Sequence, residues 1–575
     1  MVENKGFTST TIIGIIPQYP RHTQNNIYGK VRMPPVGIIS VLCNIQAPNL
    51  NCYAIDENNY AGPRDFKGMP DHNFLQKRNP AKIALFYGGM SNSVPRLFSL
   101  AQQYQKQGLI TIAGGSHVDA LPEETLHSGI DIVVHGEGEE IMQELMAIIL
   151  NNNQLVKDYK QKLATVKGIS FINSENKYIF TGRRSPIKNL NKLIVPDLTL
   201  IKHLHKKWSS IPINRGRGCN FKCEFCVVND QYGNFKAITP QKAFEQVVKY
   251  SDMGYKQFFF TDDNFAQDIS GAIELCTLIG NYKRKFKKKL EFTVQVRNEV
   301  AENERLIKAM KYAGVITLAI GFESPINQEL KAMSKGVTDE LLTRRARTLS
   351  KHFYLHGMFI FGYPGFVDSK FKSELNLRQR AKAYHKFFRQ SKIDTIQVLN
   401  AIPLPGTRLR AKLESEKRIF PLETVNWDKY DGLFLCYDPT SEGLDAYELQ
   451  TIPKLLMKKR YLGLFLVRNI NYGNWITWAY NATIGFPLQF GYFYSKRFIA
   501  NLIEKKRARD IELSDLPTKT LFYVPLVSTM NDIKRKWRNL AIKTYAGGLY
   551  RRWQKEYNES KHTLKLKKSI AKKTI

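Results

Sequence analysis

Cysteine is scarce in this chain, with seven among 575 residues. Three of the seven lie within one stretch of eight residues, which leaves too few for the paired bridges of a disulfide framework. Acidic residues are also few, 51 against 86 Lys and Arg, which gives a net charge of +35. The first residues lack a basic segment followed by an apolar one, so we expect no signal peptide. These absences favour a reducing cytoplasm and an anionic partner.

The clustered cysteines are Cys219, Cys223 and Cys226, which follow the spacing C-x3-C-x2-C. Three thiolates on one loop can bind three irons of a 4Fe-4S cube and leave the fourth iron without a protein ligand. The next cysteine, Cys276, stands alone. Structural zinc sites close their shell with four ligands, and electron-carrier clusters usually take four cysteines. An open iron instead suits a cluster that binds and reduces a small molecule.

From residue 211 onward the sequence repeats strand, loop and helix. The six predicted strands cover residues 211–217, 257–261, 290–296, 315–320, 357–361 and 393–399. Six such units predict a partial (β/α)6 barrel, open on one side, over residues 200–425. Polar or glycine residues lie at the ends of these strands, on the face where barrel enzymes place their chemistry. They are Asp262, Asp263, Asn264, Gln295, Arg297, Glu323 and Gly362.

The N-terminal segment, residues 1–190, alternates short apolar strands with amphipathic helices. This α/β pattern predicts a doubly wound parallel sheet. Ligands bind such sheets beyond the carboxyl ends of the strands. Two glycine turns follow predicted strands there, and they supply the candidate binding residues Gly114, Gly115, Ser116, Gly136 and Glu137.

The cysteine spacing, with Phe225 directly before the last cysteine, resembles the radical S-adenosylmethionine (SAM) superfamily. The resemblance implies that the amino and carboxylate groups of SAM chelate the open iron, and that electron transfer releases a 5'-deoxyadenosyl radical. It also implies a SAM contact for each strand-end residue. Asp262, Asp263 and Asn264 would hold the amino group, and Gln295 and Arg297 the carboxylate or ribose. Glu323 would accept from the ribose hydroxyls, and Gly362 would let the backbone approach the adenine.

The N-terminal segment resembles the cobalamin-binding domain that precedes the barrel in one large radical SAM group. The matching pieces are residues 34–38, 55–57, 113–117 and 136–139. The D-x-H-x-x-G motif that supplies a histidine ligand to cobalt is absent, because Pro17 to Thr23 follow the first strand instead. Two outcomes stay open: cobalamin bound without a histidine below the cobalt, or a fold that has kept its shape and lost the cofactor.

The C-terminal region, residues 426–575, is predicted to be basic and mainly helical. Residues 451–575 hold 26 Lys and Arg against 7 Asp and Glu, a net charge of +19. An uncharged stretch between Arg468 and Lys496 is rich in aromatic residues, but it is too polar and too broken to span a bilayer. Aromatics flanked by basic residues are typical of peripheral binding to an anionic membrane surface. The alternative is a helical cap whose aromatics fill its own core.

The predicted function is that of a radical SAM enzyme. It would cleave SAM reductively with a 4Fe-4S cluster and functionalise an unactivated carbon of a small or lipid-like substrate, with cobalamin-dependent C-methylation as one outcome. A radical cyclase or coupling enzyme without cobalamin is an alternative. A tRNA methylthiotransferase needs three further N-terminal cysteines, and that third of the chain has only Cys43 and Cys52, so nucleic acid is not expected as a partner. We expect flavodoxin or ferredoxin as electron donor, and a cytoplasmic protein that can lie at the inner face of the membrane.

Overall fold

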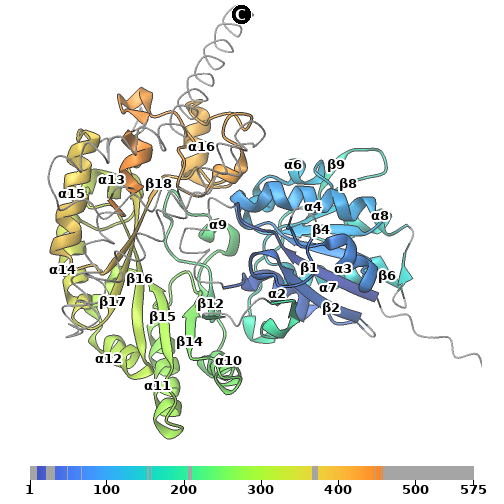
Figure 1. Cartoon of the computed structure of the whole chain (residues 1–575), viewed down its shortest axis with the longest axis horizontal. Helices are drawn as coiled ribbons and strands as arrows, with labels where there is room; N and C mark the ends of the chain where they lie inside the picture. The colour runs from blue at the N-terminus through green and yellow to red at the C-terminus, as the bar shows by residue number, and fades with distance from the viewer. Residues whose placement is uncertain are drawn as a thin grey trace, which may run out of the picture.

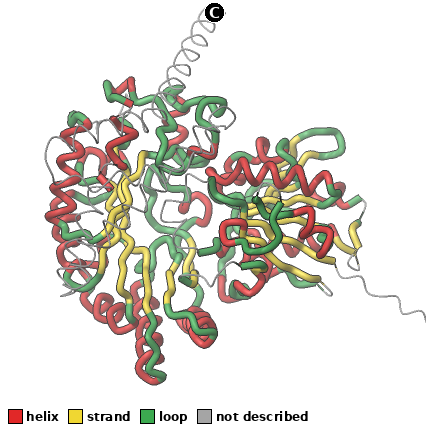
Figure 2. The backbone as a smooth tube through the Cα atoms, viewed as in Figure 1, coloured by secondary structure: helices red, strands yellow, loops and turns green. Residues whose placement is uncertain are grey.

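The computed structural model describes residues 10–457, except 21–32, 48–49, 66–67, 152–153, 157, 205–209, 366–372, 447 and 455. Two α/β units lie side by side, an N-terminal sheet and a barrel (Figure 1). In both units the strands lie inside and helices cover them (Figure 2). The aromatic and basic stretch predicted from residue 458 onward lies outside the described residues.

The N-terminal sheet has eight strands in the order β10-β2-β1-β3-β4-β5-β8-β9. Neighbours from β10 to β5 pair in parallel, and β8 and β9 continue the sheet antiparallel. All seven residues of β1 are buried, as expected for a central strand with both faces covered. The bounds are β1 (Thr10–Ile16), β2 (Leu50–Asp56), β3 (Ile83–Tyr87), β4 (Ile110–Gly114), β5 (Ile132–Val134), β8 (Ile169–Ile172), β9 (Tyr178–Phe180) and β10 (Ile201–Lys202).

In the part of the chain that the structure describes, seven α-helices accompany this sheet. They are α2 (Val36–Asn44), α3 (His72–Arg78), α4 (Val94–Lys106), α5 (Ser116–Ala120), α6 (Pro122–Leu126), α7 (Gly138–Ile149) and α8 (Tyr159–Lys162). A short antiparallel hairpin follows α7. Its two strands, β6 (Leu150–Asn151) and β7 (Gln154–Leu155), have two residues each. The helices α5 and α7 begin directly after the glycine turns at the carboxyl ends of β4 and β5, so these turns lie at one edge of the sheet.

The second unit is a six-stranded parallel sheet in the order β11-β14-β15-β16-β17-β18. The first and last strands do not pair with each other, which confirms the predicted open, partial barrel. The strands are β11 (Ile211–Ile213), β14 (Gln257–Phe260), β15 (Glu291–Val296), β16 (Val315–Glu323), β17 (Tyr354–Phe361) and β18 (Thr395–Asn400). The helices are α10 (Pro240–Asp252), α11 (Ile269–Lys285), α12 (Glu304–Ala313), α13 (Asn327–Ala332), α14 (Asp339–Ser350), α15 (Leu377–Gln390) and α16 (Arg408–Ser415).

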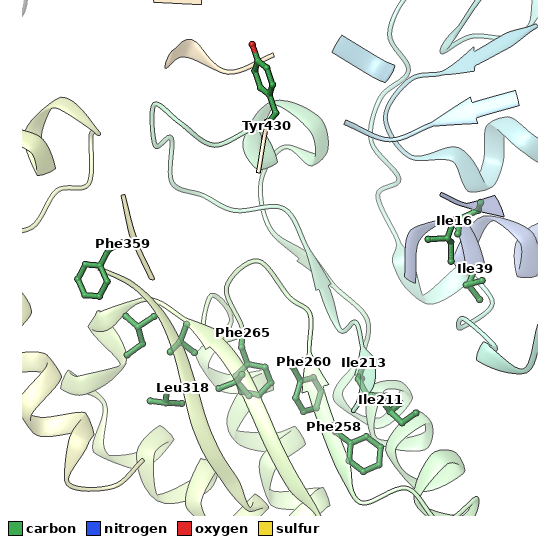
Figure 3. Close-up of a cluster of buried hydrophobic side chains, with 14 of the residues drawn as sticks. Ile16, Ile39, Ile211, Ile213, Phe258, Phe260, Phe265, Leu318, Phe359 and Tyr430 are labelled. Atoms are coloured by element: carbon green, nitrogen blue, oxygen red, sulfur yellow. The ribbon is translucent and has the colours of Figure 1, made fainter. Parts of the chain in front are cut away.

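The barrel core is aromatic on its first strands (Figure 3). The rings of Phe258 and Phe292 stack with centroids 5.2 Å apart, and Phe260 stacks on Phe292 at 5.8 Å. Ile211 and Ile213 of β11 pack beside them. Buried apolar residues of the two units form one continuous cluster, so the hydrophobic effect holds the N-terminal sheet and the barrel together.

Residues 427–446 form a cap that touches both units. Trp427, Tyr430 and Tyr437 are buried. The indole of Trp427 donates a hydrogen bond to Glu124 of α6 (2.7 Å), and the hydroxyl of Tyr437 donates one to the carbonyl of Gly362 after β17 (3.1 Å). None of the helices in the described part of the chain is long and apolar enough to cross a membrane.

Candidate active site

The cysteine loop lies between two short elements, β12 (Gly216–Arg217) and α9 (Val228–Tyr232). It begins where β12 pairs with β13 (Lys236–Ala237) in an antiparallel ladder. Gly218 has a φ of +84°, and a Cβ there would lie 2.7 Å from the carbonyl oxygen of Gly233. The position therefore requires glycine. The side-chain amide of Asn229 donates to the carbonyl of Cys219 (2.8 Å), which anchors the loop from inside.

The three thiols lie close enough to influence one another. Burial, with smaller contributions from Cys223, Asp263 and Cys219, raises the pKa of Cys226 to about 12. Burial also raises the pKa of Cys219. The thiolate, not the thiol, is the form of cysteine that binds a metal. Because burial favours the protonated thiols, the positive charge of a bound metal would be needed to stabilise the thiolates. Among the described residues, no three His, Cys, Asp or Glu side chains converge on one ion; a cube takes each thiolate on a different iron.

Asp262 and Asp263 hold the chain that leads into the loop. Asp262 is fully buried, and its Oδ1 accepts from the backbone N–H of Arg215 (2.8 Å). Asp263 Oδ2 accepts from the N–H of Gly218 (3.1 Å). Burial raises the pKa of both carboxyl groups to about 6. The structure thus places both predicted residues against the cysteine loop, with one oxygen of each used by its backbone.

Asn264 and Gln295 lie on the same side of the loop. The side-chain amide of Asn264 donates to Oε1 of Gln267 (3.3 Å), and that oxygen lies 3.9 Å from the sulfur of Cys219. The Oδ1 of Asn264 is buried without a hydrogen-bond partner. Gln295 is half-buried on β15, and its carbonyl accepts from Phe265 (2.9 Å). An unpaired buried amide oxygen beside the cysteines fits an acceptor for an ammonium-like ligand group.

Contacts with Phe221 of the cysteine loop and with Lys335 link Arg297 and Glu323 to this loop. The guanidinium of Arg297 lies over the ring of Phe221, 3.6 Å from its centroid, and pairs with Glu299 (2.9 Å). Arg297 also donates to the carbonyl of Lys335 (3.2 Å). The ammonium of Lys335 pairs with Glu323 (2.9 Å), which has a φ of +63°. Such a backbone conformation at a non-glycine residue is typical of functional sites.

Gly362 lies further along the barrel, in a turn covered by the cap. Its φ is +65°, and a Cβ there would lie 2.2 Å from a methyl group of Leu449. A side chain here would adopt a strained backbone conformation and would displace the side chain of Leu449.

A cavity of about 390 Å³ lies between the N-terminal sheet and the elements that flank the cysteine loop, β12 and α9. Four of the five predicted residues of the N-terminal sheet line it, while Ser116 does not and donates instead to the carbonyl of Gly89 (2.9 Å). Across the cavity lie Gly216, Arg217 and Asp263. The cavity thus joins the two units that the sequence predicts to bind cofactors. Its N-terminal lining residues from the prediction are Gly114, Gly115, Gly136 and Glu137.

The cavity fits a large ligand held close to the backbone. A Cβ at Gly37 or Gly136 would meet nothing within 4 Å, and both residues line the cavity. No histidine is among the described lining residues, in line with the missing histidine motif of the sequence. Cobalamin would therefore be held here by shape and backbone contacts, with no histidine from these residues.

Sequence reasoning missed the ion pairs beside this cavity. Arg217 pairs with Glu137 (3.0 Å) and Glu139 (2.6 Å), and Lys236 also pairs with Glu137 (3.1 Å). Glu137 was predicted to bind a cofactor, and both its oxygens have protein partners. The one available signal was the position of Arg217 at the end of β12, two residues before Cys219.

The family model described as "Radical SAM superfamily" matches residues 213–377. An uncharacterized methyltransferase of Pyrococcus horikoshii is 28% identical over 370 residues, covering 63% of this chain and 73% of its own. An anaerobic magnesium-protoporphyrin IX monomethyl ester cyclase of Rubrivivax gelatinosus is 24% identical over 56% of this chain, and the match spans only 56% of the cyclase. The structure of the cobalamin-dependent SAM radical enzyme OxsB, with aqua-cobalamin and SAM bound, aligns with a TM-score of 0.58 at 13% identity, over 81% of this chain and 73% of OxsB.

The cysteine loop, the open six-stranded barrel and this family match define a radical SAM enzyme. The alignment with OxsB takes in both units, so the two proteins share a fold in which an N-terminal α/β sheet precedes the barrel.

Proposed function

We propose that this enzyme cleaves SAM reductively and methylates an unactivated carbon of a small or lipid-like substrate with the help of cobalamin. The cavity between the N-terminal sheet and β12 carries this proposal, because its lining joins the glycine turns after β4 and β5 to Arg217 and Asp263, which lie beside the cluster loop. The relative from Pyrococcus horikoshii, named a methyltransferase, supports the reaction class. When bound, the cluster would supply the electron that splits SAM, and the corrinoid would supply the methyl group.

The chain's own residues have three tasks in this scheme. Cys219, Cys223 and Cys226 hold the cluster on a loop fixed by Asp262 and Asp263. Other strand-end groups, among them the free oxygen of Asn264, bind and orient SAM over the open iron. The N-terminal sheet and the cap close the carboxyl end of the barrel, which excludes water from a radical that would react with most C–H bonds.

A radical cyclisation is the second candidate, because one relative is named a cyclase of a magnesium porphyrin. That match covers little more than half of the cyclase, so the substrate does not transfer from it. An external one-electron donor such as flavodoxin or ferredoxin belongs to either reaction. We place the enzyme in the cytoplasm, with the basic C-terminal region as a candidate contact to the inner face of the membrane.

The cluster assignment is tested by anaerobic reconstitution with iron and sulfide. The wild type should bind close to four irons per chain and convert SAM to 5'-deoxyadenosine when a reductant is added. Cys223→Ala should lose both properties. Cys52→Ala, a half-buried cysteine of the N-terminal sheet, is the matched control and should keep both. SAM cleavage by Cys223→Ala at the wild-type rate would refute the assignment.

The reaction class is tested separately. Protein produced with cobalamin supplied should copurify with a corrinoid, and the methyl group of isotopically labelled SAM should appear in the product. Mass spectrometry of lipids and small metabolites from cells with and without the protein would identify that product. A product that carries no label, formed by corrinoid-free enzyme, would favour the cyclase and remove methylation.

A further inference from the structure

A second feature lies at the opposite end of the barrel from the cysteine loop, where α10 and α11 end. We define the α10–α11 tip as residues 252–256 and 283–289. It holds seven Lys and Arg and one acidic residue, Asp252, a net charge of +6 in twelve residues. Figure 1 shows α11 projecting beyond the barrel strands at this end. Neither the cluster nor the cavity of the active site uses any of these residues.

Large apolar side chains are exposed within the same tip. Phe286 is 54% exposed and Met253 is 44% exposed. Tyr282 links the two segments that carry them, because its ring lies 5.0 Å from that of Phe286 and its hydroxyl donates to Asp252 (2.9 Å), the residue before Met253. Lys288 pairs with Asp252 (3.2 Å), which neutralises the one acidic group of the tip. Exposed apolar groups inside a basic patch suggest a partner with an anionic surface and an apolar interior.

A groove of about 540 Å³ runs between the two helices beside these residues. Five apolar or aromatic residues line the groove: Phe244, Val248, Leu278, Tyr282 and Phe286. Lys285 and Lys288 also line it, together with Asn281 and Asp252, and Lys288 pairs with Asp252. The apolar lining suits an acyl chain, and the lysines suit the phosphate of a headgroup.

We propose that the α10–α11 tip docks on the surface of a bilayer that contains anionic lipids, with Phe286 and Met253 inserted at the headgroup boundary. Lysine or arginine beside aromatic residues is the composition that interfacial binding uses. RNA is the alternative partner for a patch of basic and aromatic residues, and the transfer RNA assay below distinguishes it from a membrane. An acidic electron-donor protein bound at the tip would lie far from the cluster. The length of β15 alone separates the tip from the cysteine loop by about 20 Å.

Docking by this end would leave the carboxyl face of the barrel directed away from the membrane. The cavity, the cap and the cysteine loop then stay open to the electron donor. The proposal is independent of the reaction that the active site performs.

Vesicle co-sedimentation of the full chain tests the proposal. The test variant is Lys285→Glu/Lys287→Glu/Lys289→Glu. The control is Lys160→Glu/Lys162→Glu/Lys167→Glu, which makes the same charge change at exposed lysines of the N-terminal unit. Because each basic residue near an anionic surface raises binding about five-fold, affinity for vesicles of phosphatidylcholine with phosphatidylglycerol should fall at least ten-fold in the tip variant. The control should stay within about two-fold of the wild type.

A second pair of variants tests the apolar contact. Phe286→Ser should weaken binding several-fold, while Phe180→Ser, at a ring 44% exposed on β9, should not. Equal binding by the tip variant and its charge-matched control would overturn the proposal. So would a tip variant that binds these vesicles normally and loses binding to transfer RNA in a parallel filter assay.

Discussion

Arg217 joins the cluster loop to the N-terminal sheet through a buried ion pair with Glu139. One guanidinium nitrogen lies 2.6 Å from Oε1 of Glu139, and the hydroxyl of Ser40 donates to the same oxygen (2.6 Å). Burial opposes ionisation of Glu139, yet Arg217 and Ser40 lower the pKa of this carboxyl group. Since Arg217 stands two residues before Cys219, the loop that would hold the cluster is fixed directly to the edge of the first sheet.

Replacement of Arg217 by Gln should therefore destabilise the protein strongly. The change leaves the Glu139 carboxylate buried without its cation, which typically costs 3–5 kcal/mol. The midpoint of thermal unfolding and the corrinoid content after purification should both fall. Arg184→Gln is the control, because Arg184 pairs with Glu140 and Glu144 at a partly exposed position, where pairs contribute about 0–1 kcal/mol. Similar losses in the two variants would contradict the assigned role.

Alanine substitutions at two glycines distinguish the free-energy cost of steric crowding from that of a strained backbone conformation. Gly115 has a φ of +126°, and a Cβ there would lie 2.5 Å from the backbone nitrogen of Gly89. Gly108 also has a positive φ, +80°, but a Cβ there meets nothing within 4 Å. Gly115→Ala should cost several kcal/mol because backbone cannot move aside, whereas Gly108→Ala should cost about 1 kcal/mol from the left-handed conformation alone. Urea unfolding of the two variants measures the difference. Equal costs would show that the backbone at Gly115 shifts to accommodate the added methyl group.

We expect Asp262 to stabilise the conformation of the chain that leads into the cysteine loop. Asp262→Ala removes the buried acceptor of the Arg215 N–H, and an unsatisfied buried donor costs about 1–3 kcal/mol. Iron bound after reconstitution should drop, together with the unfolding midpoint. Asp230→Ala is the control, since this carboxylate is exposed on α9 close to the same loop. A stable Asp262→Ala protein with full iron content but weak SAM binding would instead assign Asp262 a direct contact with SAM.

The sequence predicts much of the fold because its signals are local. Six apolar runs with helical spacing between them mark all six barrel strands, and β1 to β5 are found in the same way. The antiparallel strands β8 and β9 were not predicted. β8 has four residues and β9 has three, and no residue of β9 is buried, so their apolar runs are too short to indicate strands.

The candidate site was predicted by position, but its contacts were not. Strand-end placement brings Asp262, Asp263 and Arg297 to the cysteine loop, because carboxyl ends of parallel strands share one face. Which partner each side chain takes depends on residues far away in the chain. Glu137 meets Arg217 eighty residues later, and Glu124 meets Trp427 across 303 residues. No periodicity or spacing encodes such pairs.

His117 should make the contact between the cap and the N-terminal sheet sensitive to pH. Its ring is buried, edge-on to Trp427 with centroids 4.6 Å apart, and its Nδ1 bonds to the hydroxyl of Ser91 (2.9 Å). Burial, with a smaller contribution from the nearby Arg410, lowers the pKa of His117 from 6.5 to about 3. The folded protein thus keeps the ring neutral at pH values where the unfolded chain protonates it.

Because the unfolded state binds the extra proton, the free energy of unfolding should fall as the pH drops below 6.5. The slope from this group is about 1.4 kcal/mol per pH unit and continues toward pH 3. In urea titrations at pH 7.5 and 5.5, the wild type should lose about 1 kcal/mol more than His117→Asn, which has no ring to protonate. His127→Asn, at an exposed histidine, should keep the wild-type pH dependence. If His117→Asn keeps it as well, the ring of His117 is not held neutral by the interface between the cap and the N-terminal sheet.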